Sequence, residues 1–274
     1  TGVLIVLALL SVFLPVNDLN IAGMTMSVYN LISQYILIIG SIVALVFLAV
    51  AGNEKRAAAG LTRQNWKSAV LIVLAFVGIY IVRTVVSVAV QGVSDGSGMQ
   101  YVKEWAAMFK NPMMWLNIAA LPINYFFVFI AFFGEEYGWR YYLQPVLQKR
   151  FGLRAGVIIL GVVWGLWHIP DDLFYYTQTS GIQMIFAQQI TCISLGIFFA
   201  YAYMKTQNIW VPVCLHYLNN NLIPIISGTF SADVLENQTV SWKDLPVALV
   251  LNGLCFGFFL LADVFKKKEV QEEE

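Results

Sequence analysis

Charged residues and histidines are both scarce in this chain. Aspartate, glutamate, lysine and arginine make up only 12% of its 274 residues, against 59% hydrophobic residues. Soluble domains carry roughly twice that share of charged residues, so the composition excludes an ordinary soluble protein and is typical of a multi-pass membrane protein. The formal net charge is zero, which gives no indication of a nucleic-acid partner. We therefore expect an all-α fold that forms a single integral-membrane domain over residues 1–274.

Cysteine motifs and soluble-protease motifs are also lacking. The three cysteines, Cys192, Cys214 and Cys255, stand far apart in apolar sequence. This spacing excludes a CxxC metal motif and a disulfide framework, so we expect three small core residues. The zinc-protease motif HExxH is absent, and any metal site would have to combine ligands from separate helices.

Apolar runs between polar residues predict about eight transmembrane spans, since a helix needs about 20 residues to cross a bilayer. The first run is short. We expect a span shortened at its N-terminal side rather than a signal peptide, because no basic segment or cleavage site accompanies it. The fourth run is long: either it continues past Arg140 as an amphipathic extension, or it ends near Gly134 before a separate surface helix. The predicted spans cover residues 2–16, 27–51, 68–91, 117–148, 155–170, 182–204, 208–227 and 245–265.

Lysine and arginine fall mainly on one side of these spans. Eleven of the 16 follow an even-numbered span, whereas Lys103, Lys110 and Lys243 lie on the other side, and Arg83 and Arg140 lie within spans. Cytoplasmic connections are enriched in lysine and arginine, so the pattern predicts that both termini are cytoplasmic.

Three short polar segments interrupt the apolar sequence. One is Glu135-Glu136-Tyr137-Gly138-Trp139-Arg140, and the others hold the only two histidines, in Trp164-x-x-x-His168 and His216-x-x-x-Asn220. Ionisable residues within spans are costly to bury, and they are therefore functional candidates.

These segments are predicted to lie at similar depths. Glu135 precedes Lys149 by 14 residues, and His168 follows Arg154 by 14. At 1.5 Å of rise per residue, both lie roughly 20 Å from the basic boundary, and His216 lies roughly 15 Å from it. We expect one polar site that is reached from the cytoplasmic side.

Helical spacing suggests different roles for the two glutamates. Glu136 and Arg140 are separated by one helical turn, with the acid first, which favours an ion pair. Glu135 points about 100° away and is free to face a cavity as a general base for water. The two imidazoles can position that water, donate to an oxyanion or bind a metal. Zinc is an alternative that the sequence leaves open, with Glu135, His168 and His216 as its ligands.

The order of the three motifs resembles the CPBP family of intramembrane proteases, which includes CAAX prenyl endopeptidases and bacteriocin-processing, Abi-type proteins. The resemblance covers a motif core at residues 135–220. One departure is Trp164, where phenylalanine is commoner. The resemblance implies hydrolysis of a peptide bond in a membrane-associated or lipidated substrate. It also implies that Glu135 activates water with His168, that His216 and Asn220 stabilise the oxyanion, and that Glu136 and Arg140 support the site.

Two other functions compete with this prediction. A non-proteolytic membrane scaffold or bacteriocin-immunity protein is the main alternative, although the complete motif set argues against it. A small transporter with a proton relay is the second, but we find no inverted repeat that would favour it.

Polar and small residues outside the motifs carry structural expectations. We expect Arg83 to form a structural salt bridge within its span. Asp171 and Asp172 follow Pro170, where a helix is expected to end, so they predict an external loop. The Gly134/Gly138 and Gly161/Gly165 pairs have the spacing of close helix contacts, and we expect them to draw the fourth and fifth spans together.

Overall fold

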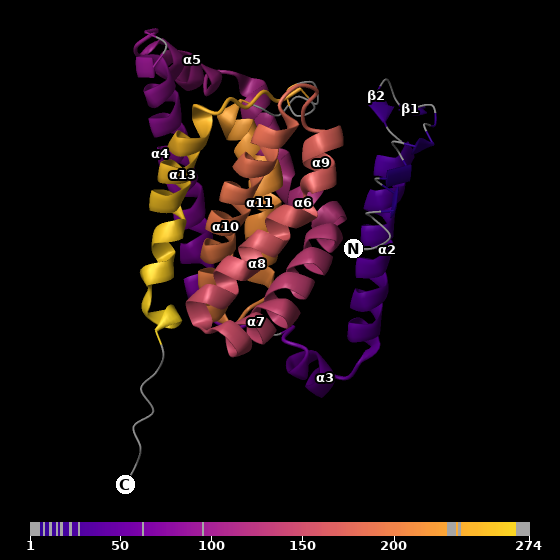
Figure 1. Cartoon of the computed structure of the whole chain (residues 1–274). Helices are drawn as coiled ribbons and strands as arrows, with labels where there is room; N and C mark the ends of the chain where they lie inside the picture. Colours follow the sequence, from indigo (N-terminus) through magenta and orange to yellow (C-terminus); the bar gives the residue numbers. More distant parts are fainter. Residues whose placement is uncertain are drawn as a thin grey trace.

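The structure is a bundle of long helices (Figure 1). The computed structural model describes residues 6–7, 9–10, 13–14, 16, 19–21, 24–26, 28–61, 63–94, 96–228, 234 and 237–266. Over these residues the expected all-α class is confirmed, with one exception near the N-terminal end. There, β1 (Leu19–Ile21) and β2 (Met24–Met26) pair as a small antiparallel hairpin.

The helices follow the predicted apolar runs closely. Those before the first motif are α2 (Val28–Val50), α3 (Asn53–Ala58), α4 (Trp66–Ser94), α5 (Gln100–Met108) and α6 (Pro112–Glu136). Those around the motifs are the π-helix η1 (Tyr137–Leu143), α7 (Gln144–Phe151), α8 (Leu153–Trp167), α9 (Ile169–Phe174), α10 (Gly181–Thr206) and α11 (Trp210–Ser227). The last are α13 (Asp244–Cys255) and the 3-10 helices η2 (Gly257–Leu261) and η3 (Asp263–Phe265).

Four of the described helical segments are long and apolar enough to cross a membrane. They are Trp66–Ser94, Pro112–Phe151, Leu153–Phe174 and Gly181–Thr206. Shorter apolar helices occur at Ile38–Val50 and Asp244–Cys255. The count of eight spans is therefore not confirmed, and most of the predicted span 2–16 lies outside the described residues.

The fourth predicted span is a continuous helical segment of 40 residues. It passes through Gly134 without a break, and its α-helical hydrogen-bonding pattern changes to a π-helix directly after Glu136. It ends at Gly152, whose φ of 89° places it in a conformation that glycine adopts at little cost. The chain then returns along α8.

Helix α10 is the centre of the bundle. Its face towards α4, α8 and α11 is almost completely buried, and it includes Leu195, Phe198 and Phe199. Phe76 of α4 stacks on Phe198, and Trp164 of α8 lies against Phe199. This apolar core holds α8 and α11 against α10. His168 lies at the end of α8, and His216 lies on α11.

Glycines allow α8 to approach α10 very closely. A Cβ at Gly161 would lie 2.6 Å from Cα of Ile193, and one at Gly165 would lie 2.7 Å from the side chain of Gln189. The prediction that the Gly161/Gly165 pair packs against the fourth span is therefore wrong. The pair brings α8 against α10 and not against α6. Gly134 instead faces Ser41 of α2, where a Cβ would lie 1.8 Å from Oγ.

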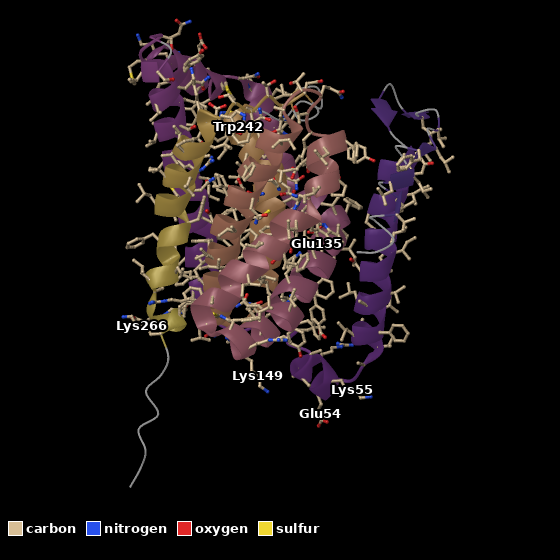
Figure 2. All side chains as sticks on the ribbon, in the orientation of Figure 1. Glu54, Lys55, Glu135, Lys149, Trp242 and Lys266 are labelled. Atoms are coloured by element: carbon tan, nitrogen blue, oxygen red, sulfur yellow. The ribbon has the colours of Figure 1, made fainter. Side chains whose placement is uncertain are left out.

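Lysines from three separate connections lie at the same end of the bundle. Figure 2 shows Lys55, Lys149 and Lys266 at one end, Trp242 at the other, and Glu135 between them. The three lysines belong to separate connections that the sequence assigned to one side of the membrane, so the helix arrangement is consistent with that assignment.

The α8–α10 contact leads to a stability prediction. Substitution of Gly161 by alanine places a methyl group against backbone, which cannot move aside as a flexible side chain can. We expect Gly161→Ala to destabilise the fold by about 1–3 kcal/mol, the usual cost of overpacking. The measurement is thermal unfolding of purified protein in detergent.

Gly253→Ala is the matched control, since a Cβ at Gly253 meets nothing within 4 Å. In a helix this change is neutral or mildly stabilising. Equal melting temperatures for the two variants would contradict the proposed packing role of Gly161.

Candidate active site

Glu135 lies in the last turn of α6, directly before the π-helix η1. It is half-buried, whereas its neighbour Glu136 is fully buried. Short π-helical segments within α-helices are frequent at functional sites, because the wider turn redirects the side chains that follow. The different exposure of the two glutamates agrees with the division predicted from helical spacing.

Glu135 forms part of the wall of a cavity of about 420 Å³. The cavity lies between α2 and the α6–η1 segment, and small residues such as Gly40 and Gly138 line it together with Trp139 and Trp167. The tyrosine hydroxyls of η1 attach this region to α3: Tyr137 donates to the carbonyl of Ala59 at 3.0 Å. The carboxylate thus borders an apolar space that is large enough for a peptide side chain or a lipid segment.

Glu136 joins two segments of the site. Its Oε2 accepts a hydrogen bond from Nε of Arg140 at 2.9 Å, so the expected ion pair is present. Its Oε1 accepts from Nδ1 of His216, on α11, also at 2.9 Å. The sequence did not indicate this second contact, because residues 80 positions apart have no helical spacing to relate them.

Arg140 is fully buried and has several partners besides Glu136. Its Nη1 donates to the carbonyl of Gly196 on α10 at 3.1 Å. Its guanidinium lies 5.6 Å from the ring centres of both Trp164 and Phe199. Arginine is well suited to such a site because its plane stacks on aromatic faces while its edge donates hydrogen bonds.

His168 lies where α8 ends and α9 begins. Its Nδ1 is 2.9 Å from the carbonyl oxygen of Trp164. A carbonyl only accepts, so Nδ1 carries the hydrogen, and in the neutral ring Nε2 has a lone pair. The ring of Trp164 packs against both imidazoles, with its centre 6.0 Å from that of His168 and 5.4 Å from that of His216.

The prediction of an external loop at Asp171 and Asp172 is wrong. Both residues lie in α9, because Pro170 occupies the first turn of a new helix, where it needs no N–H partner. Asp172 is completely buried, and Asp171 is half-buried and interacts electrostatically with Glu135. The acidic character of the site therefore extends beyond the three motifs.

Asn220 lies one turn after His216 on α11 and is exposed. Its Oδ1 accepts a hydrogen bond from Nδ2 of the adjacent Asn219 at 2.9 Å. The Glu135 carboxylate interacts with the side chain of Trp139, and it interacts electrostatically with His216 of α11 and Asp171 of α9.

The described side chains of the site do not form a zinc site. Among the residues that the structure describes, no group of three histidine, cysteine, aspartate or glutamate side chains is arranged to hold a metal ion. Nδ1 of His216 is directed at Glu136, which leaves only Nε2 for any other ligand. Glu135, His168 and His216 thus do not form a ready three-ligand set, and we derive no step through a metal.

The buried Glu136–Arg140 pair leads to a second prediction. Arg140→Gln leaves the Glu136 carboxylate buried without its main counter-charge, which typically costs about 3–5 kcal/mol. The expected result is a strong drop in the melting temperature of the purified protein.

The double variant Glu136→Gln/Arg140→Gln is the informative comparison. It contains no uncompensated charge, so we expect it to recover part of the lost stability. If it is less stable than Arg140→Gln alone, the ion pair is not the reason for the destabilisation.

Comparisons with known proteins agree with the three motifs. Residues 117–222 match the family described as Type II CAAX prenyl endopeptidase Rce1-like. The chain is also similar to a protein of Methanococcus maripaludis named CAAX prenyl protease 2, with 27% identity over 125 residues that cover 42% of this chain and 45% of that protein. The chain thus spans less than half the length of this curated relative, and no solved structure matches it. The family resemblance predicted from Glu135–Arg140, His168 and His216 is confirmed over residues 117–222.

Proposed function

We propose that the protein is an intramembrane endopeptidase that cleaves a membrane-associated or lipidated peptide near its C-terminus. The observation that carries this proposal is the hydrogen bond between Glu136 of α6 and His216 of α11, next to a glutamate, Glu135, that borders an apolar cavity. A carboxylate at the edge of such a cavity can meet both a water molecule and an apolar substrate. The family match and the name of the archaeal relative support the same class of reaction.

In the proposed mechanism Glu135 is the general base. It takes a proton from water, and the resulting hydroxide attacks the peptide carbonyl. Nε2 of His168 is oriented by the hydrogen bond between Nδ1 and Trp164, and it holds the water by accepting its second hydrogen. Glu135 then returns its proton to the leaving amine nitrogen as the carbon–nitrogen bond breaks.

His216 stabilises the oxyanion in this scheme. Its Nδ1–H donates to Glu136, and in the imidazolium form its Nε2 would also donate, to the oxyanion. The amide of Asn220 is placed one turn further along the same helix and supplies a second donor. Glu136 and Arg140 act as positioning residues, because they hold His216 rather than the substrate.

The basic end of the bundle is proposed to face the cytoplasm. Lys55, Lys149 and Lys266 lie together at that end (Figure 2), and lysine enrichment is the usual mark of cytoplasmic connections. The proposal also keeps the expectation that both termini are cytoplasmic and that the site is reached from that side. We expect Lys149→Cys to react with a membrane-impermeant maleimide in inside-out vesicles and not in intact cells.

Lys243→Cys is the matched position at the opposite end and should show the reverse pattern. Labelling of both positions from the same side would contradict the orientation. This result would leave the chemistry of the site unaffected.

The role of Glu135 can be tested with purified protein in liposomes. The substrate is an internally quenched, farnesylated peptide with a C-terminal CAAX sequence. We expect Glu135→Gln to lower kcat by at least about 10²–10⁴, the usual effect of losing a general base. Glu104→Gln, at an exposed glutamate of α5, should cleave at the rate of the unaltered protein.

Two further arms of this assay separate the alternatives. Cleavage that persists with a strong zinc chelator and without bound metal agrees with the metal-free scheme, whereas loss of activity that zinc restores would replace it. Equal cleavage by Glu135→Gln and the unaltered protein would refute the role of Glu135. A complete lack of cleavage by the unaltered protein would favour the non-proteolytic scaffold or immunity protein.

A further inference from the structure

Arg83 is an intramembrane cation outside the three motifs. It lies in the second half of α4 and is half-buried. The salt bridge expected from the sequence is not found, because the ion pairs among the described residues involve Glu136 and Asp263 and not Arg83. Instead, Nε of Arg83 donates to Oδ1 of Asn252 at 2.7 Å, and its guanidinium lies 5.8 Å from the ring centre of Tyr80.

These contacts leave hydrogen-bond donors without acceptors. Asn252 is 97% buried, since only 3% of its surface is exposed, and within the described part of the chain its Nδ2 has no hydrogen-bond partner. Among the described residues, the hydrogen bond found for the Arg83 guanidinium uses Nε and not its two terminal amino groups. A cation and an unpaired amide donor in apolar surroundings together favour an anion, and a planar carboxylate fits the guanidinium fork best.

A chain of contacts connects this place to the proposed active site. The hydroxyl of Tyr80 donates to Oδ1 of Asn219 at 2.5 Å, and Asn219 in turn donates to Asn220 at 2.9 Å. Tyr80 also belongs to the buried core that contains Trp164 and Cys192. The Arg83–Asn252 pair therefore lies on the α4–α13 side of the site, opposite the cavity that Glu135 borders.

We propose that Arg83 and Asn252 bind the C-terminal carboxylate of the peptide substrate. This inference rests on the proposed function, since cleavage near the C-terminus places a carboxylate a few residues beyond the scissile bond. The contacts from Asn220 through Asn219 and Tyr80 to Arg83 mark the direction in which the residues after the scissile bond would run. The pair would thus select a free C-terminus and set the distance from it to the cleaved bond.

The test compares two fluorescent, farnesylated CAAX peptides of identical sequence, one with a free C-terminal carboxylate and one with a carboxamide. Binding is measured by anisotropy to the Glu135→Gln protein in nanodiscs, so that no cleavage is required. We expect the carboxylate peptide to bind about tenfold more tightly, as for one charge-assisted bidentate contact. With Arg83→Gln added, the two peptides should bind alike, whereas Arg83→Lys should retain part of the preference.

Arg154→Gln is the matched control, because Arg154 is an exposed arginine at the start of α8. It should keep the tenfold preference. If Arg83 had a purely structural role, Arg83→Gln would weaken the binding of both peptides equally and leave the ratio of their dissociation constants unchanged. In the active protein, Arg83→Gln should raise KM for the carboxylate peptide about tenfold with little change in kcat.

The outcomes separate this inference from the proposed function. Equal binding of the two peptides, or no binding of either, would overturn the carboxylate site. A carboxylate preference in a protein that never cleaves would leave the site standing and refute the peptidase proposal. Cleavage without any preference between the two peptides would support the peptidase proposal and refute the carboxylate site.

Discussion

The buried carboxylate of Glu136 is the interaction on which the site depends. One of its oxygens accepts from Arg140 and the other from His216, so a single side chain joins α6, the π-helix η1 and α11. A carboxylate in an apolar interior is stable only when its oxygens are satisfied and its charge is compensated. Both partners are therefore fixed in place, and the orientation of the His216 ring follows from them. The adjacent Glu135 is half-buried and borders the cavity, which is why the proposed water activation is assigned to it.

Close helix packing makes this arrangement possible. Gly161 brings α8 against the backbone of α10, and the carbonyl of Gly196 on α10 accepts from Arg140. A larger residue at Gly161 would separate the two helices and displace Trp164, whose ring packs against both imidazoles. The apolar core and the polar site thus share the same helices, and the site cannot be loosened without disturbing the core.

The sequence predicted the parts of this structure that depend on local periodicity. The extents of α2, α4 and α10 follow from apolar runs, and the Glu136–Arg140 pair follows from helical spacing. It failed where a contact depends on packing between distant segments. The bond between Glu136 and His216 has no local signature, and the partner of Gly161 is set by how α8 lies on α10. Pro170 does not by itself distinguish the end of one helix from the start of the next, because a proline is equally well suited to both places.

The two intramembrane arginines show how structural and ligand-seeking charges differ. Arg140 is completely buried, with a carboxylate, a backbone carbonyl and two aromatic faces around it. The carboxylate compensates its charge, and Nε and Nη1 both donate hydrogen bonds. Arg83 is half-buried and has a neutral amide and one tyrosine ring, neither of which compensates its charge. Because an uncompensated cation in a low-dielectric interior is costly, it is retained only where water or an anion can reach it. The incomplete set of partners, rather than the charge itself, is what points from Arg83 to a substrate carboxylate.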